Sequence, residues 1–104
     1  MQVPTLVSDK HADIADLCQR NGARRLDLFG SAVREDFDPV RSDLDFVVVF
    51  KELAPAAYAE SFFALKEGLE ALFARPVDLV VERAIRNPYF RQRVATERQA
   101  VYAA

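Results

Sequence analysis

The sequence predicts an α/β fold in which a small sheet of three to four strands is covered by helices. Three short apolar runs, at 24–29, 44–50 and 76–82, have the length of strands, and segments with apolar residues at helical spacing alternate with them. The chain of 104 residues contains no linker-like, repeated or low-complexity segment. We therefore expect a single domain spanning residues 1–104.

The first half of the chain is expected to form a helix, a strand and a short helical turn. Ser8 is a candidate N-cap for a helix that runs to Cys18, since a serine hydroxyl can accept from an unpaired backbone N–H. Gly22, with the asparagine before it, is the expected stop signal. A strand over 24–29 and one or two helical turns over 31–36 follow.

The second half is expected to continue the alternation. The loop 37–42 leads into the strand 44–50, which is apolar on both faces and therefore central in the sheet. Pro55 opens a helix with apolar residues at three-and-four spacing, and the third strand follows it. Asn87 and Pro88 form a capping signal for a final helix that runs to about Tyr102.

Two groups of side chains in this half are interpreted as structural. The aromatic residues of the Pro55 helix are expected in the core, although one of two adjacent phenylalanines must point away from it. These are Tyr58, Phe62 and Phe63. The arginines of the last segment are interpreted as a solvated helix face, with a partner-facing or nucleotide-facing role as the alternative for one or two of them. They are Arg83, Arg86, Arg91, Arg93 and Arg98.

Composition excludes several classes of site. Cys18 is the single cysteine, which rules out an internal disulfide and fits a reducing cytoplasm, and it is expected to be a core thiol. His11 is the single histidine, so a zinc site with several His or Cys ligands is excluded. The net charge of −2 disfavours tight sequence-independent binding of nucleic acids. No apolar stretch approaches the roughly 20 residues that span a membrane, and the N-terminus lacks a signal-peptide pattern.

Two carboxylates stand at the head of the most apolar strand. Asp43 and Asp45 are two positions apart, so in a strand they point to the same face, roughly 6.5–7 Å apart. At an effective dielectric of about 20, two negative charges at that spacing repel by about 2 kcal/mol. Divalent cations remove this repulsion, and paired catalytic metals lie about 3.5–4 Å apart. The spacing thus predicts that the two aspartates bracket a metal pair.

The step Gly30-Ser31 lies just upstream and offers a backbone that a phosphate can approach. Ser31 is expected at the start of a helical turn, where backbone N–H groups are unpaired. Arg34, one turn further on, could reach a phosphate as a bidentate donor. The alternative for Arg34 is a surface ion pair with Asp36 or Asp38.

A third aspartate also lies inside an apolar strand-like run. Asp78 is the one charged residue inside the apolar run 76–81. If this strand pairs beside the one that carries Asp43 and Asp45, a strand separation of about 4.8 Å allows the three carboxylates to converge. The alternative is that each aspartate caps a turn or lies on a solvated sheet face. Asp27 has no acidic partner two positions on, and we interpret it as an exposed or edge residue.

These residues resemble a known family, the minimal nucleotidyltransferases of the DNA polymerase beta superfamily. The resemblance covers most of the chain. It rests on Leu28-Phe29-Gly30-Ser31, on Ser42-Asp43-Leu44-Asp45-Phe46-Val47-Val48 and on Val77-Asp78-Leu79-Val80. It implies a polymerase-beta-like fold with a small mixed sheet. The stretch from Ala32 to Ser42 is one residue longer than the spacer common in that family, a difference that could reshape the rim of the pocket.

The resemblance also implies roles for the site residues. ATP would bind with its phosphates over Gly30 and Ser31, and Asp43 and Asp45 would hold two Mg²⁺ ions. Asp78 would complete the second metal site and could accept the proton of the attacking hydroxyl. Attack on the α-phosphorus would transfer a nucleoside monophosphate and release pyrophosphate.

The family further implies a partner, because larger relatives carry extra domains that this chain has no room for. A protein partner or self-association is expected to complete the shallow site. The usual companion is an α-helical HEPN ribonuclease toxin, so the leading hypothesis is a cytoplasmic antitoxin that transfers AMP from ATP to a toxin tyrosine. The alternatives are a non-catalytic antitoxin that masks the toxin, and nucleotidyl transfer to a small molecule.

Overall fold

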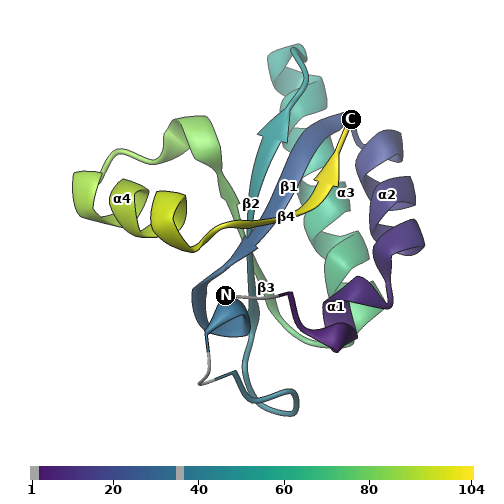
Figure 1. Cartoon of the computed structure of the whole chain (residues 1–104). Helices are drawn as coiled ribbons and strands as arrows, with labels where there is room; N and C mark the ends of the chain where they lie inside the picture. Colours follow the sequence, from purple (N-terminus) through teal and green to yellow (C-terminus); the bar gives the residue numbers. More distant parts are fainter. Residues whose placement is uncertain (1–2, 35–36) are drawn as a thin grey trace.

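A mixed four-stranded sheet forms the centre of the protein, as the computed structural model shows for residues 3–34 and 37–104 (Figure 1). Its strands are β1 (Ala23–Phe29), β2 (Leu44–Phe50), β3 (Val77–Val81) and β4 (Gln99–Ala103), in the order β3-β2-β1-β4. β2 runs parallel to β3, whereas β1 runs antiparallel to both β2 and β4. The predicted mixed sheet of three to four strands is confirmed.

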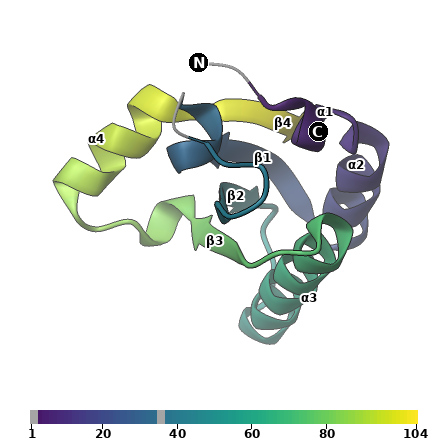
Figure 2. The ribbon, with the colours of Figure 1, turned by 90° about the horizontal axis from the view of Figure 1, so that it is seen from below.

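Helices cover both faces of this sheet (Figure 2). The helices α1 (Thr5–Ser8), α2 (His11–Arg20) and α3 (Pro55–Phe73) pack on one face, and α4 (Pro88–Glu97) packs on the other. The short helical turns η1 (Gly30–Val33) and η2 (Glu82–Ala84) follow β1 and β3. The central strands are therefore buried on both sides, which explains why β2 is apolar on both faces.

Alternation along the strands sorts residues between the two faces. Leu44, Phe46 and Val48 of β2 belong to the larger core with α2 and α3. Val47, like Phe29 of β1, belongs to a smaller core beneath α4. Because Asp45 lies two positions before Val47, it points to the α4 face. The face that α4 covers is therefore the face that carries the candidate site.

The N-terminal helix begins later than the sequence predicted. Ser8 ends the short helix α1, and α2 begins at His11 after Lys10, which makes no side-chain capping bond. The predicted stop is correct, since Gly22 has φ +69° and α2 ends just before it. The predicted cap of the last helix is also correct, because the Asn87 side chain accepts from the backbone N–H groups of Tyr89 and Phe90.

The prediction that the final helix runs to about Tyr102 is wrong. α4 ends at Glu97, and the next residues form β4, which pairs antiparallel with β1. The physical reason is that β1 lies inside the sheet only if a fourth strand hydrogen-bonds to its second edge. An unpaired edge of a buried strand would leave backbone N–H and C=O groups without partners.

Asp27 and Arg98 also differ from their predicted roles. Asp27 is fully buried in the central strand β1, not exposed or at an edge. It forms ion pairs with Arg25, at 2.8 Å between Oδ2 and Nη2, and with Nε of Arg98. Arg98 also contacts Glu82 at 2.8 Å and is mostly buried. Burial of the Asp27 charge requires such partners, and only the fourth strand brings Arg98 close enough to supply one.

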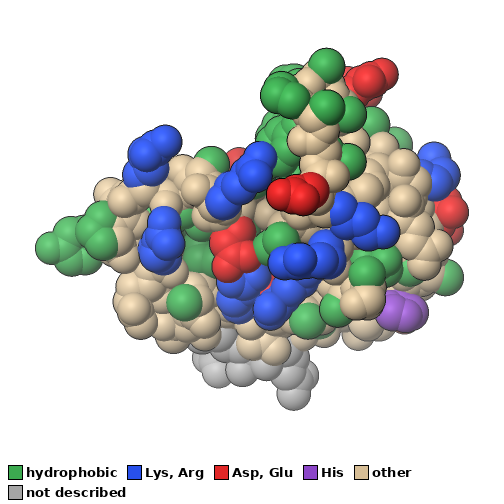
Figure 3. Space-filling view, turned by 90° about the horizontal axis from the view of Figure 1, so that it is seen from above, with side chains coloured by type: hydrophobic (Ala, Val, Ile, Leu, Met, Phe, Trp, Pro, Cys, Tyr) green, Lys and Arg blue, Asp and Glu red, His purple; other side chains and the backbone are tan. Residues whose placement is uncertain are grey.

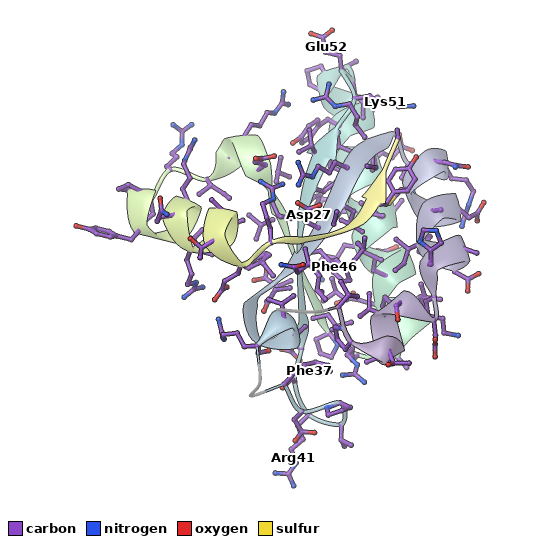
Figure 4. All side chains as sticks on the ribbon, in the orientation of Figure 1. Asp27, Phe37, Arg41, Phe46, Lys51 and Glu52 are labelled. Atoms are coloured by element: carbon purple, nitrogen blue, oxygen red, sulfur yellow. The ribbon has the colours of Figure 1, made fainter. Side chains whose placement is uncertain are left out.

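Basic side chains gather around acidic ones on the end of the molecule seen in Figure 3. The side-chain view places Asp27 in the middle of the sheet, with Phe37 and Arg41 in the loop below it and Lys51 and Glu52 at the opposite end (Figure 4). β2 thus starts at the lower end of Figure 1, next to η1.

Three further predictions have outcomes in the structure. Cys18 is buried in the core, as expected, and burial raises the pKa of its thiol to about 12. Tyr58 and Phe62 are half-buried while Phe63 is exposed, so Phe63 is the one of the two adjacent phenylalanines that points away from the core. Within 3–34 and 37–104, no helix has both the length and the apolar character needed to cross a bilayer.

Candidate active site

Two of the predicted aspartates lie side by side on neighbouring strands. In the parallel pair β2–β3, Asp45 stands opposite Asp78 in the strand register. Residues opposite each other share a face of the sheet, so both point to the α4 side. Asp43 lies two residues before Asp45, just outside β2, and is exposed. The prediction that the third strand pairs beside the one bearing the aspartates is confirmed.

The charge of Asp45 is strongly influenced by its surroundings. The pKa of this carboxyl is raised to about 6, first because partial burial disfavours the ionised form and then because Asp78 and Asp43 carry like charges. The guanidinium groups of Arg34 and Arg93 act in the opposite direction. Arg93, which the sequence placed on a solvated helix face, therefore acts electrostatically on the site from α4. A half-buried acid with a perturbed pKa beside two other carboxylates is typical of functional sites.

Gly30 lies directly against the Asp45 carboxylate. Its backbone has φ +75°, a conformation that favours glycine, and a Cβ at this position would clash with Asp45 Oδ2 and lie 3.1 Å from Cγ. The backbone approaches Asp45 this closely because Phe29, the residue before Gly30, is opposite Asp45 in the register of β1 and β2. Ser31 follows in η1 and is half-buried. The predicted Gly30-Ser31 step is thus adjacent to the carboxylates.

Arg34 follows η1 and is exposed, and its positive charge lowers the pKa of Asp45. Its Nη1 contacts Glu97 Oε2 at 2.6 Å. Of the two alternative ion-pair partners, Asp36 lies outside the described residues. Asp38 accepts from the backbone N–H groups of Val40 and Arg41 and so stabilises the turn of the loop.

Glu97 is a site residue that sequence reasoning missed. It is 6% exposed, accepts a hydrogen bond from the backbone N–H of Gly30 at 3.2 Å and holds Arg34. A signal was present in the sequence, because Phe90, Val94 and Glu97 fall on one helical face with apolar members. A carboxylate on an otherwise apolar face indicates a buried partner.

The acidic set fits a divalent cation by its chemistry, since carboxylate oxygens are ligands that Mg²⁺ prefers. The pKa of Asp45 is raised first by burial and then by the like charges of Asp78 and Asp43, and a cation would offset those charges. In the described part of the chain, no three acidic, His or Cys side chains converge on one point as they are placed. That Asp43, Asp45 and Asp78 hold metal together therefore stays a prediction.

The arrangement can bind a phosphorylated substrate and position it for attack. Carboxylates on β2 and β3 lie beside a glycine backbone that has no side chain in the way, with Arg34 and Arg93 as nearby cations. The sequence profile of the family described as "Nucleotidyltransferase domain" matches residues 14–101, which include all these groups. The chain belongs to this nucleotidyltransferase family.

Relatives of similar length support the assignment. Two proteins of Methanocaldococcus jannaschii, each named as a putative protein adenylyltransferase, are 33% and 32% identical to this nucleotidyltransferase over 85 residues. These matches cover 82% of this chain and 81% of each relative. A solved structure described as a putative minimal nucleotidyltransferase is 34% identical, covers 95% of both chains and aligns with a TM-score of 0.66.

More distant solved structures share the fold. A chain of a toxin–antitoxin crystal structure with AMP-PNP aligns with a TM-score of 0.67 at 24% identity, over 90% of this nucleotidyltransferase and 73% of that chain. A chain from the complex of tri-AMPylated Shewanella oneidensis HEPN toxin with MNT antitoxin aligns with a TM-score of 0.62 at 22% identity. The alignment covers 91% of this nucleotidyltransferase and 71% of that chain. Together with the 34% identical structure, these two structures confirm the predicted fold of a minimal nucleotidyltransferase.

Proposed function

We propose that this nucleotidyltransferase is a metal-dependent protein adenylyltransferase that acts as an antitoxin, transferring AMP from ATP to a tyrosine of a HEPN-type ribonuclease toxin. The observation that carries the proposal is the position of Asp45, opposite Asp78 in the strand register and in contact with Gly30. Two M. jannaschii relatives named as adenylyltransferases support protein as the acceptor class.

The residues of the site divide the chemistry between them. Gly30 and Ser31 would lie under the triphosphate, where the glycine backbone permits close approach, and Arg34 would bind phosphate oxygens as a planar donor. Asp43, Asp45 and Asp78 would hold Mg²⁺, which when bound neutralises phosphate charge and favours ionisation of the acceptor hydroxyl.

The transfer itself is a substitution at the α-phosphorus. The tyrosine oxygen forms a bond to the α-phosphorus, and the bond between this phosphorus and the oxygen that bridges to the β-phosphate breaks, releasing pyrophosphate. The phenol proton passes to Asp78. A tyrosine hydroxyl has an ordinary pKa of about 10, so it requires such help at neutral pH.

A HEPN-type partner is proposed because the site is open and because related folds occur in toxin–antitoxin complexes. Asp43 and Asp78 are exposed, because α4 covers only part of this face and the described chain has no further layer above these two residues to hold an acceptor. A protein surface that carries the tyrosine would supply this layer. One solved relative comes from a complex with an AMPylated HEPN toxin.

The decisive experiment combines this chain with a HEPN protein from an adjacent reading frame, ATP and Mg²⁺. Mass spectrometry should find AMP on a tyrosine of the partner. Asp43→Asn with Asp45→Asn should abolish the modification and the neutralisation of ribonuclease activity, while binding to the partner survives. Absence of added AMP although the two proteins bind would contradict the proposal, and neutralisation that survives both substitutions would establish masking instead.

A further inference from the structure

Glu97, the last residue of α4, contacts both Gly30 and Arg34, which lie at the two ends of the short turn η1. The side chain of Glu97 is 8% exposed, and its two oxygens have different partners. Oε1 accepts from the backbone N–H of Gly30 at 3.2 Å, and Oε2 contacts Arg34 Nη1 at 2.6 Å. One buried carboxylate thus holds both the glycine and the arginine that we assign to the nucleotide.

The position of Glu97 is fixed by packing, independently of the loop that it contacts. Val94, one turn earlier, is buried in the core beneath α4. The Phe90 ring packs edge to face on Phe29, with 5.9 Å between the ring centroids. On the other side, Arg98 is tied to the buried Asp27. The backbone at Glu97 is therefore held in place, because residues before and after it are tied to the sheet by packing and by an ion pair.

The contacts indicate what this carboxylate does. Hydrogen bonds from a guanidinium or a backbone N–H to a carboxylate are charge-assisted and directional. They favour the positive φ of Gly30 beside Asp45 and hold Nη1 of Arg34 next to the Gly30 loop. Glu97 carries the same charge as a phosphate, so direct binding of phosphate by Glu97 is unfavourable. Its effect on a nucleotide must pass through Gly30 and Arg34.

We propose that Glu97 is a positioning residue that sets the phosphate-binding geometry of Gly30 and Arg34. This inference rests on the proposed function, because it assumes that these two residues bind the triphosphate. It assigns the α4–β4 junction, far from the sequence motif, a role in nucleotide affinity.

The test measures binding of AMP-PNP with Mg²⁺ by calorimetry, together with kcat and KM for ATP. Glu97→Gln keeps the shape and an acceptor for the Gly30 N–H but removes the charge that orients Arg34. We expect the Kd of AMP-PNP and the KM for ATP to rise about tenfold, with kcat changed far less. Arg34→Ala should also weaken binding, and adding Glu97→Gln to it should cause no further loss, because both act through one contact.

Two further measurements separate positioning from a general loss of structure. Glu82→Gln removes a charge that pairs with Arg98 at the same junction but contacts neither Gly30 nor Arg34, so nucleotide affinity should be unchanged. Amide hydrogen exchange at Gly30 should accelerate in Glu97→Ala, which lacks the acceptor, and stay slower in Glu97→Gln.

The outcomes distinguish this inference from the proposed function. If the wild-type chain binds AMP-PNP and a folded Glu97→Gln binds it equally well, the positioning role is overturned while the proposed function stands. Additive losses in the double variant would overturn it as well. If the wild-type chain binds no AMP-PNP, the proposed function fails, and the role of Glu97 in nucleotide binding fails with it.

Discussion

Gly30 and Asp45 are in direct contact, and the Asp45 carboxylate fills the space that any side chain at position 30 would need. A Cβ on Gly30 would lie 3.1 Å from Asp45 Cγ and 3.3 Å from its Cβ. Gly30 directly follows β1 and Asp45 lies in β2, and the pairing of Phe29 with Asp45 brings them together. The backbone at Gly30 and the side chain of Asp45 are therefore packed so closely that neither can change size without moving the other.

Gly30→Ala should impair both the site and the fold. The positive φ costs a residue with a Cβ about 1–3 kcal/mol, and the methyl group must displace Asp45. We expect loss of nucleotide transfer and a free energy of unfolding lower by about 1–3 kcal/mol in urea titrations. Gly68→Ala is the matched control, since its Cβ would meet the flexible end of Leu17, away from the site. Full transfer by Gly30→Ala would contradict the steric argument.

Asp45→Asn should stabilise the fold while removing activity. The pKa of Asp45 in the folded chain, about 6, exceeds its ordinary value of 3.8, so folding disfavours the ionised form. Its contribution to stability is therefore most favourable below pH 3.8, declines as the pH rises from 3.8 to about 6 and stays low above that. The variant should have a higher melting temperature than the wild type above about pH 7, and this advantage should shrink toward pH 4. A constant difference across this range would refute the assigned cause.

Asp27→Asn should destabilise the protein severely without altering the acidic site. Removing one partner of a buried ion pair leaves the other charge uncompensated, which costs about 3–5 kcal/mol. Here the mostly buried Arg98 loses its fully buried partner but keeps its ion pair with Glu82, so we expect a cost at the lower end of this range. Asp16→Asn, in an exposed pair with Arg20, should change stability by less than about 1 kcal/mol in the same denaturation assay. Similar small losses in both variants would show that the buried pair is unimportant.

Cys18 should not react with thiol reagents in the folded state. Burial raises the pKa of its thiol to about 12, and the thiolate is the reactive form. At about pH 8, a chromogenic disulfide reagent should label the native chain only at the rate of global unfolding. Labelling should be complete in denaturant, and rapid labelling of native protein would place Cys18 outside the core.

The sequence predicted those features whose signals are local. Strands β1, β2 and β3 follow from short apolar runs, and the helix after Pro55 follows from apolar spacing. Asp45 and Asp78 were recognised because a charge in an apolar strand requires an explanation. The Gly30-Ser31 step was recognised through its proximity in sequence to Asp43 and Asp45.

The missed features depend on contacts between distant segments. β4 was assigned to a helix because the need of β1 for a second neighbour is not visible in residues 99–103. For the same reason Arg98 was placed on a solvated face and Asp27 at an exposed or edge position. Glu97 shares a helical face with Phe90 and Val94, but the partners of its carboxylate, Gly30 and Arg34, lie in a distant segment that this pattern does not specify.

By itself the sequence determined the identity of most elements, the family and the acidic set, because periodicity, turn residues and short motifs encode them locally. The tertiary structure decided the pairing of Asp45 with Asp78, the contact of Gly30 with Asp45 and the anchoring of the loop by Glu97. These relationships arise when strand register and the packing of α4 bring together residues up to 67 positions apart. The sequence specifies which side chains are available, whereas the fold determines the distances at which these side chains form a site.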